Sequence, residues 1–150
     1  MAGVRFTAAV DGVATGTAKK TILQVTPAAN HRVKVSEWGI SFNGTTNTDA
    51  PIEVELVRQT DAGTMTSLTL VKVNEDDGET LQTTAQHTST SEPTEGSVRK
   101  RSYIHPQGGM VWQAPFGQEI ILTGSTSDRL ALVVTAGVSV SCEAYMVCEE

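Results

Sequence analysis

The sequence has few aromatic residues and no long apolar run, and each shortage excludes a class of protein. Of its 150 residues 5% are aromatic, 39% are hydrophobic and 19% are charged, a balance typical of a globular chain. No stretch approaches the roughly 18 apolar residues of a membrane-spanning helix. The first residues also lack the apolar segment of a signal peptide. We therefore expect a globular protein that is made in the cytoplasm of its host, is not exported and has no membrane partner.

Positive charge is scarce as well. Eleven Lys and Arg residues stand against 17 Asp and Glu, which gives a net charge of −6. Such an excess of negative charge disfavours binding to nucleic acid or to anionic lipid. The one basic cluster, Arg99-Lys100-Arg101, is better explained as a solvated strand edge, or as a charge partner for the acidic residues before it, than as a DNA-binding patch. We expect no nucleic-acid partner.

Cysteine is limited to Cys142 and Cys148. If both lie in one strand, six residues separate their Cα atoms by about 20 Å. A disulfide requires roughly 4.4–6.8 Å between the two Cα atoms. The spacing therefore predicts two free thiols, which we interpret as small buried hydrophobic side chains.

Motifs that carry chemistry are missing too. His31, His87 and His105 are widely spaced, and neither cysteine has a histidine nearby, so no zinc-site spacing is present. The chain has no Gly-x-Ser-x-Gly, no P-loop and no Gly-x-Gly-x-x-Gly. Residues 74–79 superficially suggest a calcium loop, but the glycine is fifth and Ala85 would be twelfth, where an EF-hand needs Gly at six and Glu at twelve. We predict a protein that is not an enzyme and has no cofactor or metal.

What the sequence does have is alternation, which is clearest at its C-terminal end. From residue 138 onward apolar and polar side chains alternate, which predicts a long strand with one core face and one solvated face. The core face holds Val138, Val140, Cys142, Ala144, Met146 and Cys148, and the solvated face holds Ser139, Ser141, Glu143, Tyr145 and Glu149. Residues 130–135 are rich in Leu and Val, and the short link through Ala136 and Gly137 predicts that the two runs form a hairpin.

Short apolar runs between turn signals continue through most of the chain. Within residues 31–42 the apolar positions change parity after Val35, and one extra residue at Ser36-Glu37, a β-bulge, would return Trp38 and the residues after it to the core face. The predicted pattern is about eight strands, which favours an all-β antiparallel sandwich or jelly roll. The other runs are residues 21–25, 51–58, 65–73, 98–104, 110–112 and 119–122.

Two segments fall outside this pattern. Residues 1–20 are small and weakly periodic, which predicts an extended N-terminal arm that a neighbouring surface must order, followed by a sandwich domain over residues 21–150. Residues 74–96 are almost entirely polar, and a loop of that length inside a compact domain is usually functional or disordered. Trp112 lies between two turns and is interpreted either as core or as an interface anchor.

Several segments resemble a known family. Residues 34–44 (KVSEWGISFNG), 51–60 (PIEVELVRQT) and 79–88 (ETLQTTAQHT), with Glu92-Pro93-Thr94 and residues 105–108 (HPQG), resemble small proteins of tailed-phage structural gene clusters, over roughly residues 20–150. Such proteins look like capsid decoration (cement) proteins. The resemblance implies a β-sandwich or jelly-roll fold and a trimer on the phage head.

The functional expectation combines this resemblance with the lack of a chemical site. We expect a virion protein on the capsid surface, with the major capsid protein and further copies of itself as partners, most simply as a homotrimer. A carbohydrate- or receptor-binding sandwich of a phage tail or fibre is the alternative, and exposed aromatic residues would favour it. The candidate interface residues are Val4, Arg5, Phe6, Thr7, Leu81, His87 and Trp112.

Overall fold

The computed structural model describes residues 3–45 and 50–150, and every regular element in these ranges is a β-strand. The expectation of an all-β antiparallel sandwich is confirmed, with more strands than the eight or so predicted. No helix in the described ranges is a candidate membrane span. The strands are β1 (Arg5–Ala14), β2 (Lys20–Thr26), β3 (Val33–Asn43), β4 (Ile52–Gln59), β5 (Thr64–Leu68), β6 (Val71–Lys72), β7 (Thr84–Ser91), β8 (Glu95–Ile104), β9 (Gly109–Gln113), β10 (Ile120–Leu122), β11 (Arg129–Thr135) and β12 (Ser141–Glu149).

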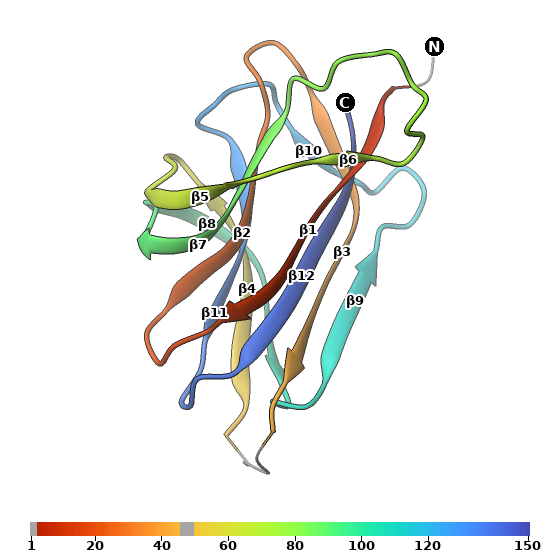
Figure 1. Cartoon of the computed structure of the whole chain (residues 1–150). Coiled ribbons are helices and arrows are strands. Elements are labelled where there is room, and N and C mark those ends of the chain that lie inside the picture. The colour runs from red at the N-terminus through yellow and green to blue at the C-terminus, as the bar shows by residue number, and fades with distance from the viewer. Residues whose placement is uncertain (1–2, 46–49) are drawn as a thin grey trace.

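The strands form two six-stranded sheets that pack face to face (Figure 1). Sheet A has the order β10-β3-β12-β1-β6, and β9 also pairs with β3, beside the stretch that β10 leaves free. Sheet B has the order β5-β7-β2-β11-β4-β8. The alternating apolar side chains of both sheets meet in a single main core. Its largest fully buried members are Trp38, Phe6, Ile22, Leu23, Ile52, Leu122, Leu130, Leu132 and Met146.

The predicted bulge in the second long strand is confirmed. In the pairing of β3 with β12, Glu37 lies opposite Val147 and Val35 lies opposite Cys148, so Ser36 is the extra residue. The shift returns Trp38 to the core face, where 1% of it is exposed. Parity changes in an apolar pattern thus located an irregularity of the backbone.

The predicted N-terminal arm is wrong for residues 5–14. They form β1, which lies inside sheet A between β12 and β6 and pairs with β12 along most of its length. Phe6 and Ala8 are 0% exposed in the core. The sequence signal was weak because alanine and glycine supply little apolar surface, although the alternation from Phe6 to Val10 is regular. The division into an arm and a separate sandwich domain therefore does not describe these residues.

The predicted polar loop over residues 74–96 is also wrong in part. Residues 84–91 form β7 and residue 95 begins β8, so the loop is confined to residues 73–83. Threonine fits a pleated strand well. The buried positions of β7 are filled by Ala85 and Ser89, whose side chains are too small to give the apolar alternation that predicts a core face.

The connection from β7 to β8 covers the outer face of sheet B. Only residues 92–94 link the two strands. In sheet B, however, β2, β11 and β4 lie between β7 and β8, so the link crosses these three strands. The amide of Thr21 donates to Glu92 over 3.0 Å, and the amide of Thr60 donates to the carbonyl of Thr94 over 3.0 Å. Beneath this crossing a second small cluster is fully buried, formed by Val57, Ala131 and Val133.

The predicted hairpin of the C-terminal runs is wrong, although both runs are strands. β11 belongs to sheet B and β12 to sheet A, so the link between them crosses from one layer to the other. Length and composition of a link cannot distinguish these two outcomes, because both need a short polar turn. The parity of β12 itself is as predicted, and Cys142 and Cys148 are buried free thiols on its core face. The predicted start at Val138 is wrong, because β12 begins at Ser141 and Val138 is 50% exposed in the link before it.

Candidate functional site

The predicted interface residues do not come together. Val4 and Phe6 are buried, whereas Arg5 and Thr7 lie on the outer face of sheet A. Leu81 packs partly against the core from the loop before β7. His87 is half-buried in β7, opposite Leu23, and Trp112 is half-buried in β9 at the other edge of the sandwich. The structure therefore divides this set among several surfaces.

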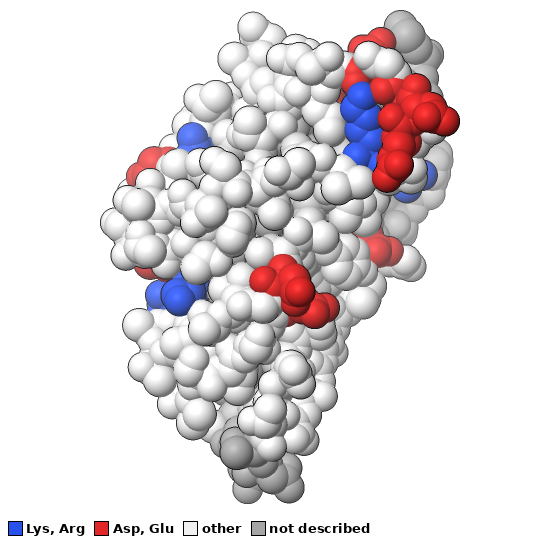
Figure 2. Space-filling model, in the orientation of Figure 1, with Lys and Arg blue, Asp and Glu red and all other residues white. Residues whose placement is uncertain are grey.

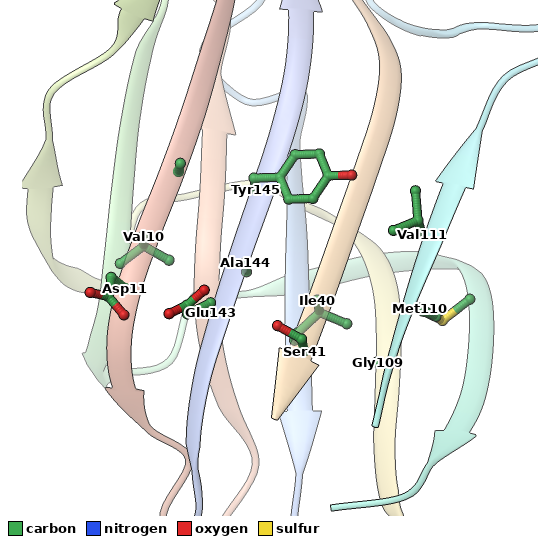
Figure 3. Close-up of a pocket in the computed structure, with 11 residues that line it drawn as sticks. Val10, Asp11, Ile40, Ser41, Gly109, Met110, Val111, Glu143, Ala144 and Tyr145 are labelled. Atoms are coloured by element: carbon green, nitrogen blue, oxygen red, sulfur yellow. The ribbon is translucent and has the colours of Figure 1, made fainter. Parts of the chain in front are cut away.

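A trough with a volume of about 610 Å³ lies on the outer face of sheet A. Short side chains leave the backbone of the central strands bare, while Tyr145 closes one end of the trough (Figure 3). It is lined by residues of β1, β3, β9 and β12, namely Ala9, Val10, Asp11, Ile40, Ser41, Gly109, Met110, Val111, Glu143, Ala144 and Tyr145.

Tyr145 lies flat over the neighbouring strand because Gly39 has no side chain. A Cβ atom at Gly39 would lie 2.4 Å from Cε1 of the tyrosine ring. Burial, together with the hydrogen bond to the Glu37 carboxylate and the charge of that group, raises the pKa of the Tyr145 hydroxyl to about 12. Gln113 also donates to Glu37, so these three side chains hold the ring in place.

Two carboxyl groups lie together in the trough. Asp11 comes from the irregular part of β1, and Glu143 projects from β12 toward it (Figure 3). The hydrogen bond with Asp11 raises the pKa of Glu143, and the negative charge of Asp11 adds to the effect. The pair offers hydrogen-bond acceptors to a ligand, but no group of three potential metal ligands exists within residues 3–45 and 50–150.

The face that holds the trough, which we call the outer face of sheet A, also exposes apolar side chains. Val71, Val73 and Val111 are 54%, 55% and 62% exposed. Figure 2 shows that most of the surface in this view is uncharged, and that acidic side chains gather at the corner where Figure 1 places the loop after β6.

A second opening, which we call the basic cleft, lies between the sheets where β8 faces β9 and β10. It has a volume of about 400 Å³ and is lined by Trp38, Leu56, Arg58, Arg99, Lys100, Trp112, Ile120 and Ile121. The rings of Trp38 and Trp112 stack with centroids 6.4 Å apart and planes inclined by 26°. Trp112 is thus packed on the core through Trp38 while part of it stays exposed. Both interpretations of this residue stay open.

Arg58 reaches the basic cleft from the end of β4. Its Nη1 donates to Asp128 over 2.6 Å and its Nη2 donates to the carbonyl of Ile121 over 2.8 Å. Of the basic cluster at residues 99–101, only Arg101 has an ion pair among the described residues, with Glu55 at 2.9 Å. Glu55 is buried and also binds Lys19 at 2.9 Å. The acidic partner of Arg101 is therefore on β4 and not in the loop of residues 73–83.

The sequence contained a signal for the trough that was not used to predict a binding site. Glu143 and Tyr145 were assigned correctly to the solvated face of β12, and an aromatic residue on a solvated face is a candidate for binding. Asp11 was missed, because the pairing of β1 with β12 that brings it to Glu143 joins opposite ends of the sequence.

Comparisons with known proteins add little to this picture. No protein-family model matches the chain, and no curated protein matches it. Among solved structures, a chain of Cocksfoot mottle virus is 12% identical with a TM-score of 0.31, over 97% of this chain and 92% of that one. A chain of Maize chlorotic mottle virus is 8% identical with a TM-score of 0.28, over 98% and 93%. At TM-scores this low, neither the fold nor the function of those chains is carried over.

Proposed function

We propose that this chain is a structural protein of a virus particle that decorates the outside of a tailed-phage head. In this proposal it binds the major capsid protein as a homotrimer and bridges neighbouring subunits. The proposed binding to a phage head and the proposed trimer both come from the resemblance to phage decoration proteins, which is carried by residues 34–44, 51–60 and 79–88. The contact itself must come from the surface of the domain.

The observation that carries the proposal is the outer face of sheet A. Exposed valines on β6 and β9 flank a trough floored by small side chains and bare backbone. Val111 borders the trough itself, and an exposed apolar side chain beside a hollow marks a candidate interaction site. Because the trough is open and shallow, we assign it to a protein partner of matching shape.

A decoration protein acts through binding alone. Each bound copy stabilises the assembled shell by RT ln(1 + [L]/Kd), which is about 2.7 kcal/mol per site at a free concentration of 100 Kd. Bridging contacts repeated over the shell would resist the pressure of the packaged genome. No catalytic group is required for this role.

The test uses heads of the encoding virus from which this protein has been stripped. Adding the protein back is expected to raise the temperature at which the heads rupture. Val111→Asp, on the outer face of sheet A, should abolish this gain. Val138→Asp is the matched control, since Val138 is 50% exposed in the link between β11 and β12. No gain with the unaltered protein, or equal loss with both variants, would refute the proposal.

A glycan-binding module is the second candidate, and Tyr145 is the observation that favours it. A ring lying flat on a sheet beside the acceptor pair Asp11 and Glu143 offers both a stacking surface and partners for sugar hydroxyls. Under this alternative a glycan array would give hits that Tyr145→Ala removes. If the array gave no hits and the protein bound heads, the glycan-binding alternative would be refuted and the decoration role would remain.

A further inference from the structure

The polar side chains of the basic cleft present only hydrogen-bond donors. Arg58, Arg99 and Lys100 contribute cationic groups, and Trp38 and Trp112 contribute indole N–H groups. Guanidinium, ammonium and indole groups have donors and no acceptor. A ligand that satisfies this cleft must therefore bring acceptors, and negative charge would suit it best.

These donors are not used up within the chain. The Nε1 atom of Trp38 is buried and has no hydrogen-bond partner, and the same holds for Nε of Arg58. Over the part of the chain that the structure describes, neither Arg99 nor Lys100 has an ion pair. A buried donor without a partner costs about 1–3 kcal/mol, so native structures usually satisfy such groups.

The charge around Arg58 supports the same conclusion. Burial lowers the pKa of its guanidinium, and the nearby charge of Arg99 lowers it further, against the opposing effect of Asp128. Asp128 pairs with Arg58, and no ion pair between described residues neutralises Arg99. An additional carboxylate at the basic cleft would relieve this repulsion.

An exposed segment of matching chemistry follows β6. Four carboxyl groups lie within five residues of the loop after β6, which we call the acidic loop, on Glu75, Asp76, Asp77 and Glu79. Lys72 donates to the backbone carbonyl of Asp77 over 2.6 Å and helps to fix the loop. Glu75, Asp76 and Glu79 are exposed, so their carboxylates are free to meet a partner.

One copy cannot fill its own cleft with this loop. The acidic loop follows β6, at one edge of sheet A, whereas β9 and β10 lie at the opposite edge, with β1, β12 and β3 between. Three intervening strands at about 4.8 Å spacing place the two edges well beyond reach of a side chain. The partner must be a second molecule.

We infer that the acidic loop of one copy binds in the basic cleft of the next. The contact is head-to-tail, so both surfaces of each copy are used only when the chains close into a ring. Phe116 is 101% exposed in the link between β9 and β10, two strands that line the cleft, and would offer the next copy an apolar anchor. This inference rests on the self-association contained in the proposed function, and not on capsid binding.

The test is a charge swap in the full chain, read by analytical ultracentrifugation. Arg99→Glu with Lys100→Glu reverses the cleft, and Glu75→Lys with Asp76→Lys reverses the loop. Each double variant is expected to weaken self-association by on the order of 100-fold, because like charges then face each other. Combining all four substitutions in one chain restores complementary pairs at every contact of a ring, a trimer included, and should restore the assembly.

Tryptophan emission gives a second readout, because Trp38 and Trp112 are the only tryptophans and both line the cleft. A synthetic peptide of residues 73–80 should change this emission when added to the unaltered protein. The same peptide with Gln and Asn in place of Glu and Asp should not. Lys20→Glu, a charge change on β2, which contributes no residue to the cleft, is the control for net charge.

The outcomes separate the inference from the proposed function. A monomeric unaltered protein, an assembly indifferent to both double variants, or a variant with all four substitutions that fails to assemble would each overturn the head-to-tail contact. An oligomer that responds as expected but leaves stripped heads unchanged would uphold the contact and refute capsid decoration. Emission that responds to an acidic segment of another protein but not to the loop peptide would also overturn the inference.

Discussion

A substitution of Phe6 tests whether residues 5–14, which form β1, are part of the folded domain. The Phe6 side chain is 0% exposed on the core face of β1. Phe→Ala in a core costs about 3–5 kcal/mol, and at about 2–4 °C per kcal/mol for a chain of this size Phe6→Ala should lower Tm by about 6–20 °C. The loss should appear in calorimetry and in the midpoint of denaturant unfolding, without a change of the slope m.

The control lies on the same strand. Arg5 is exposed on the outer face of sheet A, so Arg5→Ala should change the free energy of unfolding by no more than about 0.5 kcal/mol. A chain lacking residues 1–14 would leave β12 unpaired along one side and should fail to fold cooperatively. If Phe6→Ala melted with the unaltered protein, or the truncated chain kept its Tm, β1 would be a detachable arm and the structural argument would be wrong.

Three further results are expected. Burial raises the pKa of the Cys142 thiol to about 12 and also raises the pKa of the Cys148 thiol. Neither thiol should therefore react with a disulfide reagent at pH 8 in the native protein, and both should react once the chain is unfolded. Fast reaction of the native protein would contradict the burial of these thiols. Burial alone would raise the pKa of Glu55, but Lys19 and Arg101 outweigh it and lower the pKa. The contribution of Glu55 to stability is therefore present above the unfolded pKa of about 4.3 and is lost as pH falls through the folded pKa. Glu55→Gln should lower Tm at pH 7 and have little effect near pH 3, and an equal loss at both pH values would exclude a role for the charge. Gly39→Ala should destabilise the chain by about 1–3 kcal/mol because its Cβ meets the Tyr145 ring, and most of that loss should vanish in a Tyr145→Ala background; an undiminished loss would mean that the ring is not what requires glycine.

Local periodicity was enough to predict the class of fold, and long-range pairing was not. The core faces of β3 and β12 follow from alternation, and the bulge at Ser36 follows from a single change of parity. The partner of a strand has no such local signal. Whether β11 and β12 share a sheet, and whether β1 finds β12, depends on surfaces that only the assembled sandwich brings together.

The missed strands share a physical cause. Small or polar residues fill the buried positions of β7, where Ala85 and Ser89 replace the larger hydrophobic residues that mark other strands. Their burial depends on neighbours supplied by β2 and β5. The trough was missed for the same reason, since Asp11 and Glu143 become neighbours only through the pairing of β1 with β12.

The central position of β12 sets the order in which the protein can be built during translation. β1 and β3 both pair with β12, yet at about 5–20 residues per second β1 would leave the ribosome many seconds earlier. Until residues 141–149 emerge, two strand edges of sheet A have no partner from their own chain. A β12 donated by a second nascent chain could occupy the same place, so polysomes and slow codons before residue 141 would favour strand-exchanged dimers. Synthesis with a stalled ribosome at that point, followed by release, would reveal how long the gap can stay open before exchange or aggregation begins.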